Sequence, residues 1–185
     1  NQNYISKGVV LDKLIESLVV SKVNINDIVI GDKNALLIAS RVLGYGKDYT
    51  FRALNSDSRQ IEDFTVDLTT LKDKILKKKD LIEEGINEFN YELPHSKTSI
   101  TFKILTHGDE KNIEKEIQGL QKIKKDSAPE ISTRLKYIIT SIEGDSEKKT
   151  IREFVDNYML ARDSRSLREE IKRVSPDVNL KYTGE

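Results

Sequence analysis

The stretch Gly31–Phe51, GDKNALLIASRVLGYGKDYTF, predicts a helix, the end of that helix and the strand that follows it. Asp32 can cap the helix, because its carboxylate accepts hydrogen bonds from unpaired backbone N–H groups of the first turn. The apolar surface of Leu36–Leu43 is too wide for an exposed helix, so we expect this helix to be largely buried. Gly44 is expected to end it in the left-handed conformation, and Tyr49–Phe51 then favours a strand.

Two hairpins are predicted after this helix. Residues 48–54 and 62–68 can form the strands of the first one, with a polar loop between them. The second is indicated by six apolar residues that alternate with polar ones: Phe89, Tyr91, Leu93, Ile100, Phe102 and Ile104. A period of two places all six on one face, which needs a cover. Together the hairpins predict an antiparallel sheet of about four strands.

Helices are predicted before and after these strands, where apolar residues recur at intervals of three or four. Residues 9–20, VVLDKLIESLVV, form the first, which makes an N-terminal pair with the Asp32 helix. The C-terminal half contains four apolar sets, namely Ile113, Ile117 and Leu120; Leu135, Ile138, Ile139 and Ile142; Ile151, Phe154, Val155 and Tyr158; and Leu167, Ile171 and Val174. Asp163 or Ser164 can cap the last of these helices.

The order of these elements indicates an α+β protein, in which the N-terminal helix pair and a C-terminal helical part flank the antiparallel sheet. We expect one boundary near residues 106–110. It would separate a part at 1–106, with the helix pair and the hairpins, from a helical part at 107–185. Leu71–Lys79 is expected to form a short charged helix or turn, and the alternation from Val178 to Tyr182 favours a terminal edge strand.

The composition excludes several classes of protein. The 31 basic and 31 acidic residues cancel, so no overall charge attracts the chain to nucleic acid or to an anionic membrane. The sequence has no cysteine and no apolar run near the ~20 residues that cross a bilayer. We therefore expect a soluble protein without nucleic-acid or membrane partners. Because the chain begins with Asn1 rather than methionine, we also expect residues to precede it.

No recognisable pattern of a catalytic, cofactor or metal site is present. Gly44–Lys47, GYGK, resembles a phosphate loop, but Arg41 and Asp48 occupy the positions where such a loop requires glycine and Ser or Thr. His95 and His107 are the only imidazoles and fall at opposite ends of the second hairpin, which does not fit a shared metal. We therefore expect a protein that is not an enzyme and has no cofactor.

Five residues of the opening stretch are the candidates for a contact site. Arg41 lies in an apolar run, so its guanidinium needs partners, either an internal carboxylate or helix-end carbonyls, or another subunit. Tyr45 and Tyr49, on either side of the turn at Gly46, can seal the core or anchor an interface. Asp32 completes the set as the predicted cap. A further apolar contact patch is expected on residues 9–20 or on the C-terminal helices.

An ordered set of short segments resembles the baseplate proteins of T-even-type contractile-tailed phages, whose members belong to the baseplate hub or its assembly. The resemblance covers most of the chain from about Leu11 onward and rests on Gly31-Asp32-Lys33, Leu36-Leu37-Ile38, Arg41, Tyr45-Gly46, Tyr49, Phe64–Leu68, Tyr91–Pro94, Ile100–Lys103, Leu105-Thr106 and Val174–Val178. Family members carry a Cys-x-x-Cys pair between the first two strands. Here that loop, Asn55–Gln60, has neither cysteine nor histidine, so a zinc site is not carried over.

The resemblance implies a structural or assembly component of the baseplate hub that acts through protein–protein contacts. Its partners would be other hub proteins in a hetero-oligomer. It would be located in the host cytoplasm during assembly and, if incorporated, in the tail baseplate of the virion. One alternative is an assembly chaperone that is absent from the finished virion. Another is a small-ligand-binding domain unrelated to phage.

Overall fold

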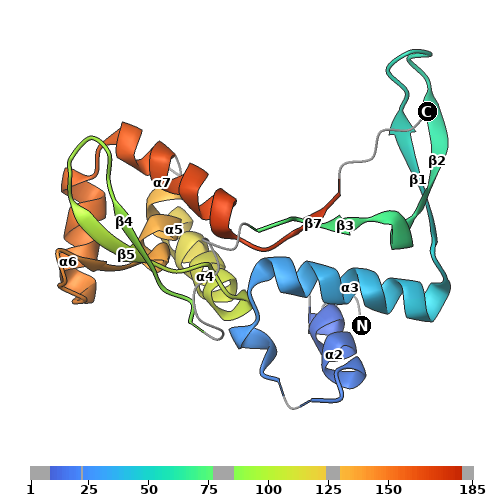
Figure 1. Ribbon diagram of the computed structural model, residues 1–185, viewed down its shortest axis with the longest axis horizontal. Helices are drawn as coiled ribbons and strands as arrows, with labels where there is room; N and C mark the ends of the chain where they lie inside the picture. The colour runs from blue at the N-terminus through green and yellow to red at the C-terminus, as the bar shows by residue number, and fades with distance from the viewer. Residues whose placement is uncertain (1–8, 22, 77–85, 124–129, 181–185) are drawn as a thin grey trace. The chain divides into compact units, whose positions relative to one another are not determined.

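The computed structural model describes residues 9–21, 23–76, 86–123 and 130–180 (Figure 1). They belong to two compact units. Unit 1 comprises the described parts of 1–25, 31–75 and 176–185, and unit 2 comprises 26–30 and the described parts of 76–175. The boundary that we expected near 106–110 does not coincide with this division, because the second hairpin shares a core with the C-terminal helices.

Helix α3 (Ile30–Tyr45) is the helix of the opening stretch, with ends that differ from the prediction. Asp32 lies inside the first turn rather than at the cap. At the other end, Gly46 has a φ of 83°, and its N–H donates to the carbonyl oxygen of Val42 over 3.0 Å. Gly46 is therefore the left-handed residue that ends the helix, and the assignment of this role to Gly44 was wrong.

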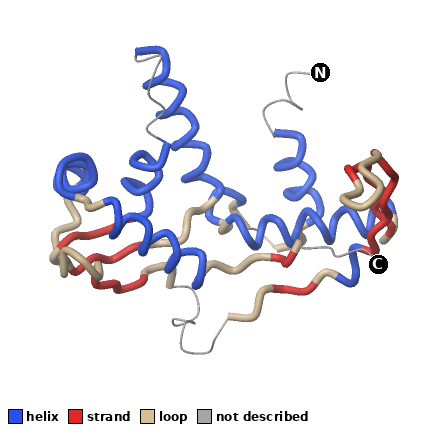
Figure 2. Tube along the Cα trace, turned by 90° about the horizontal axis from the view of Figure 1, so that it is seen from above, coloured by secondary structure: helices blue, strands red, loops and turns tan. Residues whose placement is uncertain are grey.

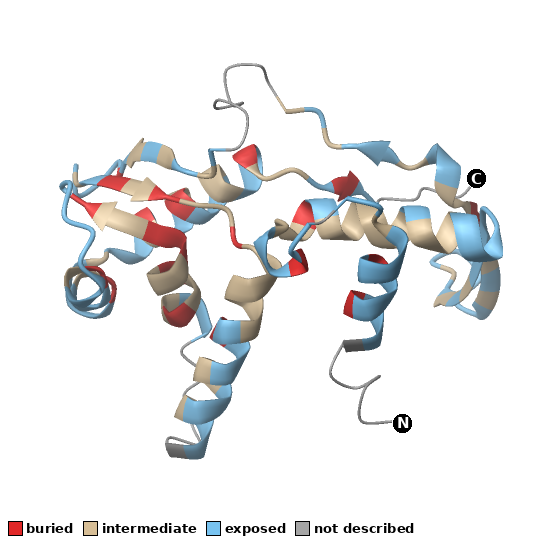
Figure 3. Ribbon diagram, turned by 90° about the horizontal axis from the view of Figure 1, so that it is seen from below, coloured by how far each residue is buried: buried red, intermediate tan, exposed pale blue. Residues whose placement is uncertain are grey.

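Helix α3 is also less buried than its apolar run predicts. Most of its side chains are half-buried, and Gly31 is its one buried residue (Figure 3). A Cβ atom at Gly31 would lie 1.8 Å from the carbonyl oxygen of Pro176, so glycine allows these two backbone segments to meet. The predicted first helix, α2 (Val9–Leu18), is present and is joined to α3 by an ion pair of 2.7 Å between Asp12 and Lys33.

Strands β1 (Asp48–Leu54) and β2 (Ile61–Asp67) form the first predicted hairpin, in which Phe51 lies opposite Phe64. The ring centroids of Tyr49 and Phe51 are 6.1 Å apart, and those of Phe51 and Phe64 are 5.9 Å apart. This hairpin is a two-stranded sheet by itself. Since such a ribbon is only marginally stable alone, the aromatic row is the main packed feature that it possesses.

A second ribbon in unit 1 joins segments that are far apart in the chain. After a 3₁₀ turn at Leu68–Thr70 (η2), strand β3 (Lys72–Asp73) pairs antiparallel with β7 (Val178–Asn179). The charged helix or turn expected at Leu71–Lys79 is absent from its described part, because the backbone there pairs with β7; the rest lies outside the described residues. The expected terminal strand is present at β7, and Tyr182 lies outside the described residues.

Unit 2 contains the second predicted hairpin, β4 (Phe89–Glu92) and β5 (Ser99–Phe102), with β6 (Ile139–Ile142) as a third antiparallel strand beside β5. The two hairpins thus lie in separate sheets and do not form one sheet of four strands. The six alternating apolar residues behave as predicted, since all of them are buried in one core or packed against it: Leu93, Ile100, Phe102, Phe89, Tyr91 and Ile104.

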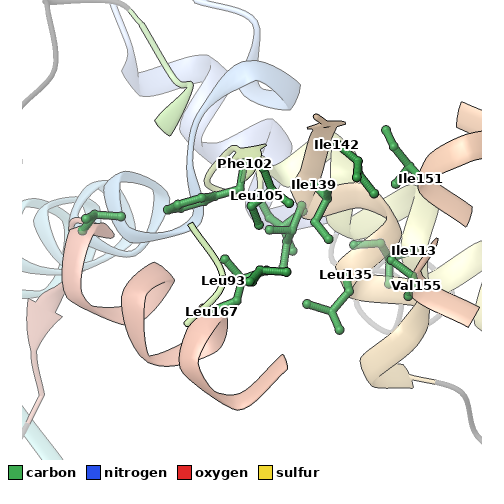
Figure 4. Packing of buried hydrophobic residues seen from close by; sticks show 13 residues of the cluster. Leu93, Phe102, Leu105, Ile113, Leu135, Ile139, Ile142, Ile151, Val155 and Leu167 are labelled. Atoms are coloured by element: carbon green, nitrogen blue, oxygen red, sulfur yellow. The ribbon is translucent and has the colours of Figure 1, made fainter. Parts of the chain in front are cut away.

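Helices provide the predicted cover of this sheet. They are α4 (His107–Ile123), α5 (Glu130–Ile138), α6 (Lys148–Glu153), which continues as a π-helical turn η4 (Phe154–Tyr158), and α7 (Ala161–Val174). Figure 4 shows the shared core, formed by Leu93, Ile100, Phe102, Leu105, Ile113, Leu135, Ile138, Ile139, Ile142, Ile151, Val155, Leu167 and Val174.

Two details of the helical predictions were wrong. The helix expected to continue to Ile142 ends at Ile138, because the following residues, rich in β-branched side chains, pair with β5 as strand β6. Asp163 does not cap α7, which begins at Ala161, but lies buried in its first turn. A turn follows β6 at residues 143 and 144, where Gly144 has a φ of 84°. The α+β class is confirmed.

Candidate protein-contact surface

The structure brings four of the five candidate residues together at the end of α3. The guanidinium of Arg41 donates to the carbonyl oxygens of Gly46 and Asp48, over 3.0 and 3.3 Å. Its central carbon lies 5.2 Å from the ring centre of Tyr45 and 5.9 Å from that of Tyr49. The cation is thus held by backbone carbonyls beyond the helix and lies over two aromatic faces, which attract it electrostatically.

This cluster is open to solvent. The exposed fraction of Tyr45 is 81% and that of Tyr49 is 45%. The two aromatic rings and the cation between them form an open aromatic surface at the helix end. Tyrosine and arginine are enriched among the residues that carry binding energy in protein interfaces. We call the set Arg41, Tyr45 and Tyr49 the helix-end cluster.

Asp32, the fifth candidate, is not part of the helix-end cluster. Nine residues separate it from Arg41 on the same helix, which corresponds to about 13 Å along the axis. Burial raises the pKa of its carboxyl group above the ordinary value. Asp32 therefore belongs to the start of α3 and not to the contact site.

A second exposed apolar surface lies on α2, which projects from α3 (Figure 2). Ile15 and Asp12 form its buried side, and Asp12 pairs with Lys33 of α3. Next to this buried side, a row of apolar residues is between 40 and 48% exposed: Val10, Leu11, Leu14 and Leu18. We call this row the α2 stripe. It lies within residues 9–20, one of the two places where the sequence predicts a contact patch.

An apolar groove adds to the open surface of unit 1. It has a volume of about 420 Å³ and runs between α3 and the residues of η2, β3 and β7. On the α3 side, the wall of the groove consists of the small side chains of Ala35 and Ala39 and the larger ones of Ile38 and Val42. Sequence reasoning missed this groove, because the apolar run of α3 was assigned to a buried core.

Polar contacts fix the hairpin next to the helix-end cluster. Lys47 donates to Asp67 over 2.7 Å, and Asp67 also accepts from Thr69. The hydrogen bond from Lys47 and those from Thr69 lower the pKa of Asp67 to about 2. The carboxylate is therefore charged at neutral pH and fastens the start of β1 to the end of β2, which supports Tyr49 in its position.

The two histidines that we considered for metal binding lie at different places, His95 in the turn between β4 and β5 and His107 at the first residue of α4. The backbone N–H of His95 donates to Asp163, and the backbone N–H of His107 donates to the carbonyl oxygen of Ile28. Within the described ranges, no group of three or more His, Asp or Glu side chains is arranged to hold a metal ion. None of the described helices is long and apolar enough to cross a membrane.

Comparisons of the chain with protein-family models, with curated proteins and with solved structures found no match. The geometry of unit 1 and the sequence itself are therefore the basis for a functional proposal.

Proposed function

We propose that this chain is a structural or assembly component of a contractile phage tail baseplate hub that acts by binding other hub proteins through unit 1. The supporting observation is that unit 1 exposes two apolar surfaces, the α2 stripe and the helix-end cluster. The ordered sequence resemblance to T-even-type baseplate proteins supports the choice of partners. The protein would act without catalysis, first in the host cytoplasm and then in the baseplate.

The small number of apolar side chains that unit 1 buries supports a role in binding. Its described residues include four buried hydrophobic side chains, Ile15, Ile25, Val66 and Val178. The single core of unit 2 contains thirteen. A small domain that buries so little apolar surface is marginal alone, and contact with a partner can supply the missing burial.

The α2 stripe allows a rough estimate of that contribution. Full burial of one Val or Leu side chain contributes about 1.5–3 kcal/mol. The four side chains of the stripe are a little less than half exposed, so covering them contributes roughly 3–5 kcal/mol before the costs of association. This is a useful share of an interface energy, and the helix-end cluster adds aromatic area to it.

A co-purification experiment tests this proposal. The full chain is co-expressed with baseplate hub proteins of a T-even-type phage, and a variant with L11S, L14S and L18S is compared with the wild type. We expect the wild type to retain hub proteins and the variant to lose them, while circular dichroism shows an unchanged helix content.

The matched control is the variant I131S, because Ile131 is similarly exposed but belongs to unit 2. This variant should retain the hub proteins. The proposal would be overturned if the wild type purified alone, or if the triple variant bound as well as the control.

The alternative of an assembly chaperone uses the same contacts but predicts absence from the finished particle. Mass spectrometry of purified virions separates the two roles, because a structural component is found in stoichiometric amount and a chaperone is not. A ligand-binding domain unrelated to phage would instead bind no hub protein at all.

A further inference from the structure

Unit 2 contains a polar cleft that the proposed contacts do not use. It has a volume of about 380 Å³ and lies where α4, α5, β6 and α6 meet. Four cationic side chains line it, Lys103, Lys136, Lys148 and Arg152, together with one acidic side chain, Asp109. Clefts of this size typically bind small molecules or single segments of a partner.

Two of the four cations are neutralised within the protein. Lys103 contacts Asp109 at 2.8 Å, and the same carboxylate accepts from the backbone of Thr106 at the start of α4. Lys136 contacts Asp156 at 2.7 Å. Because these pairs are close and partly buried, their charges are largely satisfied, and they form the fixed wall of the cleft.

The other two cations are poorly neutralised. The guanidinium of Arg152 lies 3.9 Å from the carboxylate of Glu116, which is longer than a hydrogen bond. The same carboxylate accepts a hydrogen bond from the hydroxyl of Tyr137 over 3.0 Å. Lys148 makes no hydrogen bond or ion pair with any residue in the described ranges. The cleft therefore has an excess of positive charge on its α6 wall.

The two cations of α6 lie close enough to repel each other weakly, and an anion between them would offset this repulsion. Lys148 and Arg152 are four residues apart in the helix, so they lie on one face, where like charges repel. Both line the cleft, as do Asn112 and Ser146, whose amide and hydroxyl groups can donate hydrogen bonds. Asn112 of α4 and Ser146, which precedes α6, thus add possible donors to the two cations.

We propose that this cleft binds an oxyanion group, a phosphate or a carboxylate, between Lys148 and Arg152 of α6. Charge-assisted hydrogen bonds from lysine and arginine to such oxygens are among the strongest that proteins form. The volume of about 380 Å³ exceeds that of a single phosphate, so the cleft has room for further atoms of a ligand beyond its anionic group. The site is independent of the proposed function, because its residues all belong to unit 2.

The test is a calorimetric and NMR titration of the full ¹⁵N-labelled chain at low salt with two probes. Pyrophosphate represents a phosphate-bearing small molecule, and a tetraglutamate peptide represents an acidic protein segment. We expect at least one probe to shift the amide signals around the cleft, and the probe that binds more tightly identifies the source of the anion.

Variants separate a site from general attraction to a charged surface. The double variant K148A/R152A is expected to weaken binding at least tenfold. The control K149A removes an exposed cation of the same helix that does not line the cleft, and it should change the affinity less than about twofold. The residues replaced in the double variant and in the control are exposed, so we expect both variants to keep the fold. Circular dichroism checks this expectation.

Two results would overturn the inference. One is the absence of any saturable signal change with either probe at low salt. The other is an equal loss of affinity in K149A and in the double variant, which would show a nonspecific response to net charge. Neither result would bear on the proposed contacts of unit 1, because binding of hub proteins is measured separately.

Discussion

Replacement of Asp163 is expected to destabilise unit 2 more strongly than replacement of any surface carboxylate. Asp163 is fully buried in the first turn of α7, and its two oxygens accept the backbone N–H groups of His95 and Ser96, each over 2.9 Å. These two residues form the turn between β4 and β5. One side chain thus attaches the sheet to the helix that covers it.

The magnitude follows from the two hydrogen bonds. In D163A both backbone N–H groups lose their acceptor, and each unsatisfied buried group costs about 1–3 kcal/mol, which predicts a loss of roughly 2–5 kcal/mol. D163N keeps one acceptor oxygen, but its NH₂ group faces the second N–H. We therefore expect D163N to lose nearly as much as D163A at neutral pH.

The effect should depend on pH. Burial alone would raise the pKa of Asp163, but the hydrogen bonds from His95 and Ser96 outweigh burial and hold the pKa below its ordinary value of 3.8. The stabilisation is therefore complete above about pH 4 and is lost as the pH falls through the folded-state pKa. A protonated carboxyl group resembles a carboxamide, so the difference between wild type and D163N should shrink in acid.

Urea unfolding followed by NMR signals of unit 2 measures these differences, and hydrogen exchange of the His95 and Ser96 amides reports the contact directly. The control is E169Q, since Glu169 is an exposed residue of the same helix in an ion pair with Arg165, and its change should be below about 1 kcal/mol. Equal stabilities of D163A and E169Q, or an effect that does not vary with pH, would refute the argument.

Two further predictions concern unit 1. Asp12 and Lys33 form an ion pair at 2.7 Å, and their side chains are only 10 and 13% exposed. D12A should therefore lower the free energy of unfolding by about 3–5 kcal/mol, because it leaves a buried charge unpaired. In urea unfolding, D12L/K33M should be considerably more stable than D12A. A double variant no more stable than D12A would contradict this. Gly46 has a φ of 83°, so G46A should lower stability by about 1–2 kcal/mol, while G44A, at an open helical position, should raise it by about 0.5–1 kcal/mol. The reverse order in thermal unfolding would show that Gly44 ends the helix.

Local periodicity was sufficient to predict several elements of the fold. Alternation over Phe89–Leu93 and Ile100–Ile104 placed all six apolar residues toward one core, because the period of a strand fixes which side chains share a face. The helices α2, α4 and α7 were likewise predicted from apolar residues at intervals of three or four. These predictions required only the pattern of the segment itself.

Features that depend on distant partners were not predictable in this way. The residues of β6 also have helical spacing, and only the free edge of β5 makes them a strand. Asp163 was interpreted as a local cap, because nothing in the sequence indicates that the turn at His95 lies beside it. Gly44 and Gly46 are two residues apart, about half a helical turn, and either glycine can adopt the left-handed conformation, so the sequence did not decide between them.

Part of the candidate site was predictable, because its residues are close to one another in the chain. Arg41, Tyr45 and Tyr49 are close in the chain, and an arginine in an apolar run requires partners, one option being carbonyls at the helix end. The position of the Tyr49 ring beneath the cation depends on how the hairpin leaves the helix. That geometry is set by Gly46 and by the pair of Lys47 with Asp67.

The pairing of β3 with β7 has a consequence for the order of folding during synthesis. Lys72 lies opposite Asn179, so the ribbon closes only after more than a hundred intervening residues have left the ribosome. Until then β3 presents an unpaired edge, and Gly31 lacks the Pro176 backbone against which it fits. Unit 2 can therefore assemble while unit 1 is still incomplete, and the synthesis of the β7 segment completes the unit that began first.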